Sequence, residues 1–242
     1  SALFGQARSA LAKGDIGRYR QLQPKLKTHP LYPYLEYAEL RRSLNTQSTS
    51  SVDSFLKRHE GTYVADRLNR DWLIQLGMNQ QWDRFLAYYQ PAMSSGSDIH
   101  CMYANALLAT RNKDADETMR KVWLTTNSLP RSCDRPLALW RQHGGLGSEL
   151  AWQRFELALK GNQDSLATYL LRYMNSIDRA AAQTALNAVG KPLALAKSWG
   201  YPLTNSRYRK AFLLGVHRLA QQYPDRAAHV YTSYRPQLPA ID

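Results

Sequence analysis

The sequence has few β-branched residues and no long apolar run. Leucine outnumbers valine and isoleucine together about threefold, and leucine favours helices whereas β-branched residues favour strands. A membrane-spanning helix needs about 20 consecutive apolar residues, and the longest apolar run here, residues 211–216, is far shorter. These shortages predict an all-α protein with no transmembrane segment.

The chain also lacks the short motifs that carry much enzyme chemistry. It contains no Gly-x-Ser-x-Gly, Gly-x-Gly-x-x-Gly, Walker or His-Glu-x-x-His sequence. Its six histidines are scattered, and neither cysteine has a second cysteine or a histidine at metal-ligand spacing. His143 precedes two glycines and is predicted to lie at a helix C-terminus, where a positive charge suits the dipole. We therefore expect no catalytic residue, no cofactor and no metal site.

Carboxyl groups that could act as a general acid are scarce, because the chain has only six glutamates. Glu36 and Glu39 are three residues apart on a predicted helix, so they resemble a possible acid pair. The simpler interpretation, which we prefer, is two solvated charges near Arg41 and Arg42. Three further glutamates have positions that need no catalytic role. Glu117 is at a capping position, and Glu149 and Glu156 are on the polar side of the predicted helix over 148–160.

Positive charge is in excess along the whole chain. The formal net charge is +13 and the sequence pI is about 9.8. A distributed excess suggests a broadly positive surface, whose partners could be nucleic acid, an anionic membrane surface or an anionic polymer. The charge alone does not rank these partners, and it is also consistent with a protein that merely stays soluble.

Apolar residues recur at helical spacing in short segments joined by polar turns. A helix start at Asp114 is expected from its capping-box spacing with Glu117, and another at Ser148. Main predicted helices cover residues 15–26, 31–44, 52–59, 63–76, 82–89, 98–109, 114–125, 136–142, 148–160, 163–174, 177–189, 192–199, 205–223 and 225–234, after a first helix that stops at Gly14.

One turn recurs along the sequence. Residues 10–15 and 157–162 are nearly the same string, with looser copies at 75–79 and 108–114. Their separations are irregular, whereas a tetratricopeptide array would hold a period of about 34 residues. Because no linker separates two regions, we expect one domain over residues 1–242, an irregular α-superhelix of stacked helical hairpins.

Aromatic side chains are numerous and are predicted to serve mainly the core. Five of the six tryptophans fall on apolar helical stripes, which favours packing over ligand stacking. Tyr32, Tyr34 and Tyr37 point in several directions on one predicted helix, so one or two of them should be exposed. The five tryptophans are Trp72, Trp82, Trp123, Trp140 and Trp152.

Four segments, in order, carry a family resemblance. They are the Pro- and Tyr-rich helix at 29–40, the helices at 52–60 and 68–76, the first-cysteine helix at 101–107, and the second-cysteine hairpin at 133–155. Together they resemble the helical superhelix domain of the soluble lytic murein transglycosylases. The ordered series spans about residues 1–175, and residues 176–242 match only as generic helices.

From the residues alone, Cys101 and Cys133 could form one bridge between hairpins or be two unrelated buried thiols. The resemblance implies the bridge, a ring-like helical superhelix and a periplasmic location. It implies peptidoglycan glycan strands as partners, with other envelope proteins as further candidates. In that family a Glu-Ser pair in a separate lysozyme-like domain cleaves the MurNAc–GlcNAc bond without hydrolysis, leaving a 1,6-anhydro end.

No glutamate here is followed by serine, so we expect that the catalytic domain is absent and that the chain is the N-terminal part of a longer enzyme or a short relative. The start at Ser1 fits a mature terminus after signal removal, or simply the boundary of a fragment. The alternative is a basic α-repeat module that binds protein partners or RNA, with no link to peptidoglycan. The irregular period argues against base reading and a disulfide argues against the cytosol, so nucleic acid is not expected.

Overall fold

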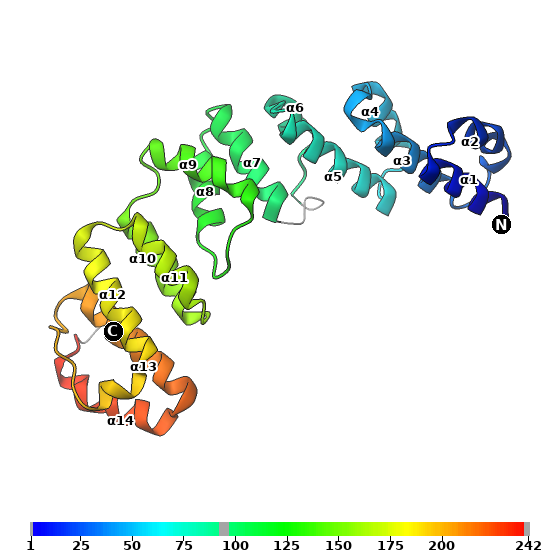
Figure 1. The fold of residues 1–242 in the computed structure, drawn as a ribbon. Coiled ribbons are helices and arrows are strands. Elements are labelled where there is room, and N and C mark those ends of the chain that lie inside the picture. The colour runs from blue at the N-terminus through cyan, green and yellow to red at the C-terminus, as the bar shows by residue number, and fades with distance from the viewer. Residues whose placement is uncertain (1, 92–96, 240–242) are drawn as a thin grey trace. The chain divides into compact units, whose positions relative to one another are not determined.

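The structure is a computed structural model that describes residues 2–91 and 97–239, and within these ranges the regular elements are all helices. The prediction of an all-α protein is confirmed. The chain divides into two compact units, unit 1 (Ser1–Thr110) and unit 2 (Arg111–Asp242) (Figure 1). Because each unit is described by itself, the single continuous array over residues 1–242 stays a prediction. In the described part of the chain, no helix combines the length and apolar character that crossing a membrane requires.

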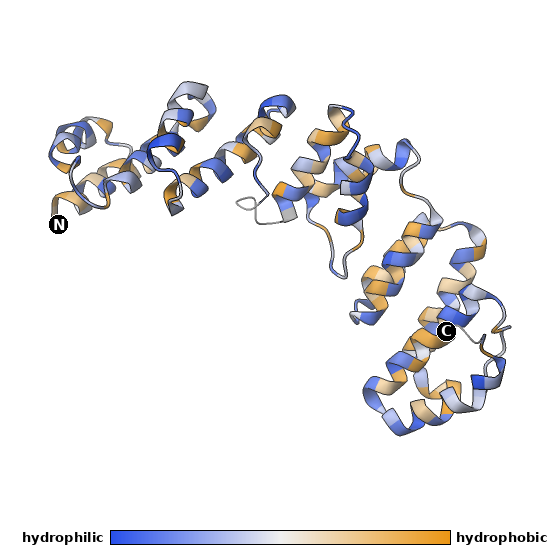
Figure 2. Ribbon diagram, turned by 180° about the vertical axis from the view of Figure 1, so that it is seen from behind, coloured by the Kyte–Doolittle hydropathy of each residue, from blue (hydrophilic) through white to orange (hydrophobic). Residues whose placement is uncertain are grey.

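The helices of each unit are short and follow one another closely. Unit 1 contains α1 (Ala2–Lys13), α2 (Ile16–Leu22), α3 (Tyr32–Arg42), α4 (Thr49–Arg58), α5 (Tyr63–Met78), α6 (Trp82–Tyr88) and α7 (Ser97–Ala109). Unit 2 contains α8 (Ala115–Trp123), α9 (Asp134–Gln142), α10 (Ser148–Lys160), α11 (Asp164–Leu170), α12 (Ser176–Gly190), α13 (Ser206–Gln222) and α14 (Pro224–Tyr234). Hydrophilic and hydrophobic residues intermingle along these helices, as expected for amphipathic hairpins (Figure 2).

The recurring turn of the sequence is a left-handed helix ending. Gly14, Gln80, Gly144 and Asn162 all have positive φ, between 56° and 80°. In each turn the next amide donates to the carbonyl five residues back, over 2.8–3.0 Å, as Asp15 does to Ala10. This is the Schellman arrangement, which satisfies carbonyls that the helix end would leave unpaired. The turn predicted at 10–15 and 157–162 is therefore confirmed, with related copies after α5 and α9.

The capping box predicted at Asp114 is wrong, whereas the helix start predicted at Ser148 is confirmed. Asp114 precedes α8, but its side chain makes no capping hydrogen bond, because its backbone (φ −85°, ψ 0°) lacks the extended conformation of a capping residue. Glu117 instead pairs with Lys121 over 2.6 Å. Ser148 is the first residue of α10 after an extended Gly147, and its hydroxyl accepts from the Asn175 amide and donates to Asp178.

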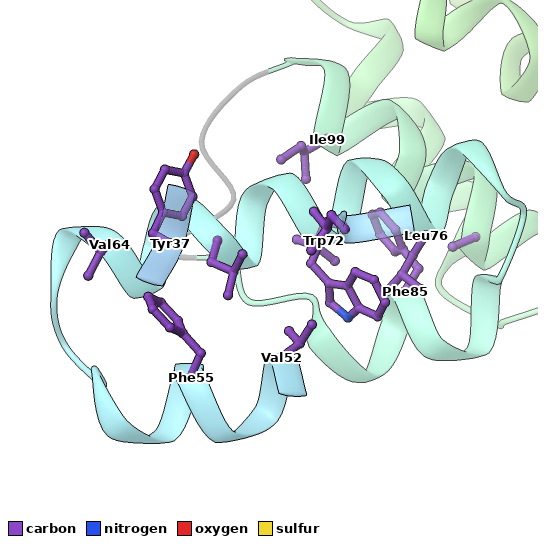
Figure 3. Packing of buried hydrophobic residues seen from close by; sticks show 12 residues of the cluster. Tyr37, Val52, Phe55, Val64, Trp72, Leu76, Phe85 and Ile99 are labelled. Carbon is purple, nitrogen blue, oxygen red and sulfur yellow. The ribbon is translucent and has the colours of Figure 1, made fainter. Parts of the chain in front are cut away.

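The main core of unit 1 forms where α4, α5 and α6 meet. Val52 and Phe55 of α4 enter the same cluster as Trp72 of α5 and Phe85 of α6 (Figure 3). All four are buried, with exposures of 0–4%. Burying each such side chain stabilises the fold by about 1.5–3 kcal/mol. This packing stabilises short helices that would not be stable alone.

Unit 2 depends on close helix contacts at small residues. The α12 and α13 helices pack against each other at Gly215, where an added Cβ would lie 2.9 Å from the Ala188 Cβ. At the end of α9, a Cβ on Gly145 would overlap the indole ring of Trp140. His143 is the C-terminal cap residue of α9, so its predicted position is confirmed. The paired glycines therefore serve two needs, a left-handed turn at Gly144 and room for an indole at Gly145.

Candidate functional site

The acid pair of α3 lies in a polar cleft of unit 1. The Glu36 carboxylate contacts Arg58 Nη2 at 3.1 Å and His59 Nε2 at 2.9 Å. The Glu39 carboxylate accepts hydrogen bonds from the Tyr19 hydroxyl at 3.0 Å and from Gln23 Nε2 at 3.4 Å. Each acid is thus held by residues of other elements.

The expectation of solvated charges near Arg41 and Arg42 is therefore wrong. Arg41 pairs with Asp71 on α5 at 3.3 Å, and Arg42 donates to the Leu11 carbonyl of α1. Both arginines join α3 to another helix instead of turning to the glutamates on their own helix. The two acids are fixed in ion pairs and hydrogen bonds, which is the arrangement of structural carboxylates.

The cleft between α2, α3 and α4 has a volume of about 560 Å³. Its walls carry hydroxyl, amide, carboxylate and guanidinium groups, with little apolar surface. Such walls offer donors and acceptors to a hydroxyl-rich ligand but no dry chamber for catalysis. The lining residues include Arg20, Gln23, Glu36, Glu39, Ser43, Gln47, Ser50, Ser51, Ser54 and Arg58.

Tyrosines beside these carboxylates stay protonated. Burial, reinforced by the Glu39 carboxylate, raises the pKa of Tyr19 far above its usual value. Burial also raises the pKa of Tyr32, against the hydrogen bond from Gln23. Tyr37 is buried and donates to Asp71 at 2.6 Å, whereas Tyr34 is 45% exposed. One exposed tyrosine among the three agrees with the sequence prediction.

The tryptophans serve the core, as predicted. Trp72, Trp123, Trp140 and Trp152 have exposures of 0–4%, and Trp82 is half-buried against the unit 1 core. Two of the indoles also bond within unit 2: Trp123 Nε1 donates to the Leu150 carbonyl and Trp140 Nε1 to Asp116, each at 2.8 Å. Their rings are therefore not available as an open stacking surface.

The two cysteines form a disulfide. Cys101 and Cys133 are 1% and 0% exposed and both are disulfide-bonded. Closing a loop of this length contributes on the order of 3–4 kcal/mol in the chain-entropy description. In the described residues, no group of three or more His, Cys, Asp or Glu side chains could hold a metal ion.

Sequence reasoning missed Tyr19, Arg58 and His59 as partners of the two acids. Arg58 and His59 follow Glu36 by more than 20 residues, and no periodicity links residues that far apart. The only available signal was local: both lie at the C-terminal end of the predicted helix over 52–59, where basic groups are favoured.

A protein-family model described as Cucumovirus coat protein matches residues 100–192. That match covers less than half of the chain. Other proteins match over much longer stretches.

Three other matches are to one kind of enzyme. The soluble lytic murein transglycosylase of Escherichia coli K12 is 26% identical over 190 residues, which cover 78% of this chain and 29% of that protein. The Salmonella typhimurium protein of the same name is also 26% identical. An inactive mutant of the lytic transglycosylase Slt from Pseudomonas aeruginosa superposes with a TM-score of 0.90 at 29% identity.

That superposition covers 99% of this chain and 39% of the Pseudomonas chain. The 70-kDa soluble lytic transglycosylase of Escherichia coli shares the fold, with a TM-score of 0.78 at 24% identity over 98% of this chain. This chain thus spans well under half the length of the proteins it matches. The matches in sequence and fold identify it as a helical domain homologous to part of the soluble lytic murein transglycosylases.

Proposed function

We propose that this chain is the helical scaffold of a periplasmic peptidoglycan lytic transglycosylase and that it holds or guides glycan strands. The observation that carries the proposal is the match to the Pseudomonas enzyme over 99% of the chain. Cleavage of MurNAc–GlcNAc bonds to give 1,6-anhydro ends would belong to a part of the enzyme outside residues 1–242. In this proposal the chain by itself contributes binding and no catalytic group.

The charge of the chain supports binding to such a polymer. A net charge of +13 attracts an anionic polymer over a distance set by the ionic strength. The stem peptides of peptidoglycan carry carboxylates, and its sugars carry hydroxyl and amide groups. The polar cleft of unit 1 offers hydrogen-bond partners to those sugar groups.

A pull-down with purified sacculi across a salt series tests the guiding role. We expect binding at low ionic strength that weakens steadily with salt, because exposed charges are screened. Sacculi whose stem peptides have been removed by an amidase are the matched control, since they keep the glycan but lose most carboxylates. Binding to neither material at low salt would refute the guiding role.

The buried disulfide supports the periplasmic part of the proposal, because such bonds persist in oxidising compartments. Non-reducing peptide mapping of protein taken from its native compartment should recover one peptide pair joined through Cys101 and Cys133. Two free thiols in that material would count against the location.

A further inference from the structure

Unit 2 buries a cation that has no carboxylate partner among the described residues. Arg154 on α10 is 3% exposed. Its Nη2 donates to the Asn127 carbonyl at 3.0 Å, and its Cζ lies 4.4 Å from the ring centroid of Trp123. Its Nε is buried and finds no hydrogen-bond partner in the part of the chain that the structure describes.

The charge of Arg154 is therefore poorly compensated. Burial lowers its pKa to about 10, and the groups that oppose this are the hydroxyls of Tyr173 and Tyr169, not a carboxylate. The side chain still carries its positive charge at neutral pH. Burying an unpaired charge is unfavourable, and a cation–π contact offsets only part of that cost.

Other shielded arginines of the same unit are neutralised. Arg207 contacts Asp178 at 2.7 Å and Glu149 at 2.6 Å, and Arg218 contacts Asp164 at 2.7 Å. Arg154 departs from this pattern, and an anion supplied from outside the chain would restore it.

Arg154 also lines a cleft of about 600 Å³ in unit 2, a volume within the usual range for small-molecule sites. Residues of α9, α10 and α11 line it, and α10 and α11 pack against each other. The other lining residues are Trp123, Ser128, Leu129, Asp134, Leu137, Ala138, Arg141, Ser165, Leu166, Tyr169 and Tyr173.

The walls of this cleft combine cations, rings and apolar groups. A second guanidinium, that of Arg141, lies 5.3 Å from the ring centroid of Tyr173. The hydroxyls of Tyr169 and Tyr173 are 3.2 Å apart, so together they offer a donor as well as an acceptor. The exposed Asp134 is the acidic residue among the described lining residues. It would repel a dianion, which favours a ligand with one negative charge.

We propose that the Arg154 cleft binds the carboxylate of a ligand whose neighbouring carbon skeleton packs on the tyrosine rings and leucines of the walls. A guanidinium presents two parallel N–H donors that match a carboxylate. The carboxylate could belong to a sugar acid or to the end of a peptide. The choice between these two sources rests on the proposed function, whereas the site rests on unit 2 alone.

Titration calorimetry on the whole 242-residue chain tests the site. The probes are N-acetylmuramic acid and D-alanyl-D-alanine, with N-acetylglucosamine as the neutral control and inorganic phosphate as the anion control. We expect at least one carboxylate probe to bind with a Kd on the order of 1 mM. Both controls should bind at least tenfold more weakly. The tighter carboxylate probe identifies the source, and failure of both carboxylate probes would overturn the site.

Variants of Arg154 separate binding from folding. Arg154→Met should weaken the best probe at least tenfold while the Tm stays equal or rises, because an uncompensated buried charge has been removed. Arg154→Lys keeps the charge but loses the fork, and it should also bind at least tenfold more weakly. Arg135→Gln, which removes an exposed arginine of α9, is the matched control and should bind like the parent chain.

These results are independent of the sacculi experiment. Unchanged affinity in Arg154→Lys would overturn the site even if Arg154→Met failed to fold. Probe binding without sacculus binding would keep the carboxylate site and remove the guiding role. Sacculus binding without probe binding would keep the guiding role and remove the carboxylate site.

Discussion

Unit 1 and unit 2 both have ion pairs between their helices, but they differ in the use of tyrosine. In unit 1, tyrosine hydroxyls donate to carboxylates: Tyr19 to Glu39, Tyr37 to Asp71 and Tyr88 to Asp53. In unit 2, arginine and lysine side chains form ion pairs with carboxylates: Arg207 with Asp178 and Glu149, Arg218 with Asp164, and Lys210 with Glu156. Helices of unit 1 are thus joined by neutral tyrosine donors in addition to ion pairs such as Arg41 with Asp71, whereas the contacts named in unit 2 use charged donors.

The difference follows the charge of each unit. Unit 1 has 13 Lys and Arg against 9 Asp and Glu, a net charge of +4, and unit 2 has 19 against 10, a net charge of +9. Unit 2 therefore carries most of the positive excess although several of its arginines are bound internally. Its stability should depend more on pH and its surface should attract anions more strongly than that of unit 1.

The largest expected effect tests whether the units unfold separately. Gly145→Ala places a methyl group on the Trp140 ring and should destabilise unit 2 by about 3 kcal/mol. Hydrogen exchange should show faster opening in unit 2 and unchanged protection in unit 1. Gly147→Ala is the control, because its Cβ would meet open space. Equal loss of protection in both units would mean that they unfold as one.

Removing one charged donor tests the ion pairs of unit 2. Arg207→Met leaves the buried Asp178 without its main partner and should cost about 2 kcal/mol, less than a fully buried pair because Arg207 is 17% exposed. Urea unfolding measures the change. Arg120→Met, which breaks the exposed pair with Asp116, should change the unfolding free energy by less than about 0.5 kcal/mol. Similar costs for both variants would mean that the shielded ion pairs of unit 2 contribute no more to its stability than the exposed ones.

Acid and alkali should unfold the two units in opposite order. Hydrogen bonds from Arg218 lower the pKa of Asp164, and those from Arg207 and Gln153 lower the pKa of Glu149. A carboxylate whose pKa is lower in the folded than in the unfolded state stabilises the fold above about pH 4. This contribution is lost as the pH falls below that value. Unit 2 should therefore lose protection first in acid.

In alkali the order should reverse. Burial and then the Asp53 hydrogen bond raise the pKa of Tyr88 to about 12, and burial with Glu39 raises that of Tyr19 further. A tyrosine whose pKa is higher in the folded than in the unfolded state stabilises the fold below about pH 10. This contribution is lost as the pH rises toward the pKa of the folded state. Unit 1 should lose protection first above pH 10. The same unit failing first at both extremes would contradict the comparison.

The smallest expected effect lies in the turn after α5. Gln80 has a φ of 56°, a conformation that costs a residue with a side chain more than it costs glycine. Gln80→Gly should stabilise unit 1 by about 0.5 kcal/mol and leave unit 2 unchanged. Gln81→Gly, at a φ of −85°, should instead destabilise slightly. Thermal unfolding of the pair against the parent chain gives the comparison, and stabilisation by both variants would refute the explanation.

Local patterns predicted the fold well because each depends on neighbouring residues. The stripe that placed Trp152 in the core and the string that placed the turn at 157–162 are both read within one helix. The capping box at Asp114 failed because spacing does not fix φ and ψ. The sequence did not predict the partners of Glu36, because they come from another helix and no pattern of spacing connects them to it.

Arg154 is an intermediate case. It lies four residues from both Leu150 and Ala158, on the buried stripe of α10, so the sequence did hold a signal: a cation at a core position. That signal could not show what surrounds the charge. Trp123 and Asn127 belong to a different part of the chain, and only the packed structure brings them to the guanidinium.

The left-handed helix endings bear on how such a chain can change over evolutionary time. Each corner is closed by its own main-chain amides and carbonyls, so neighbouring hairpins need not supply anything to complete it. Lengthening, shortening or duplicating one hairpin would leave the remaining corners intact. A lineage could in this way vary the number and size of its hairpins without inventing a new reversal.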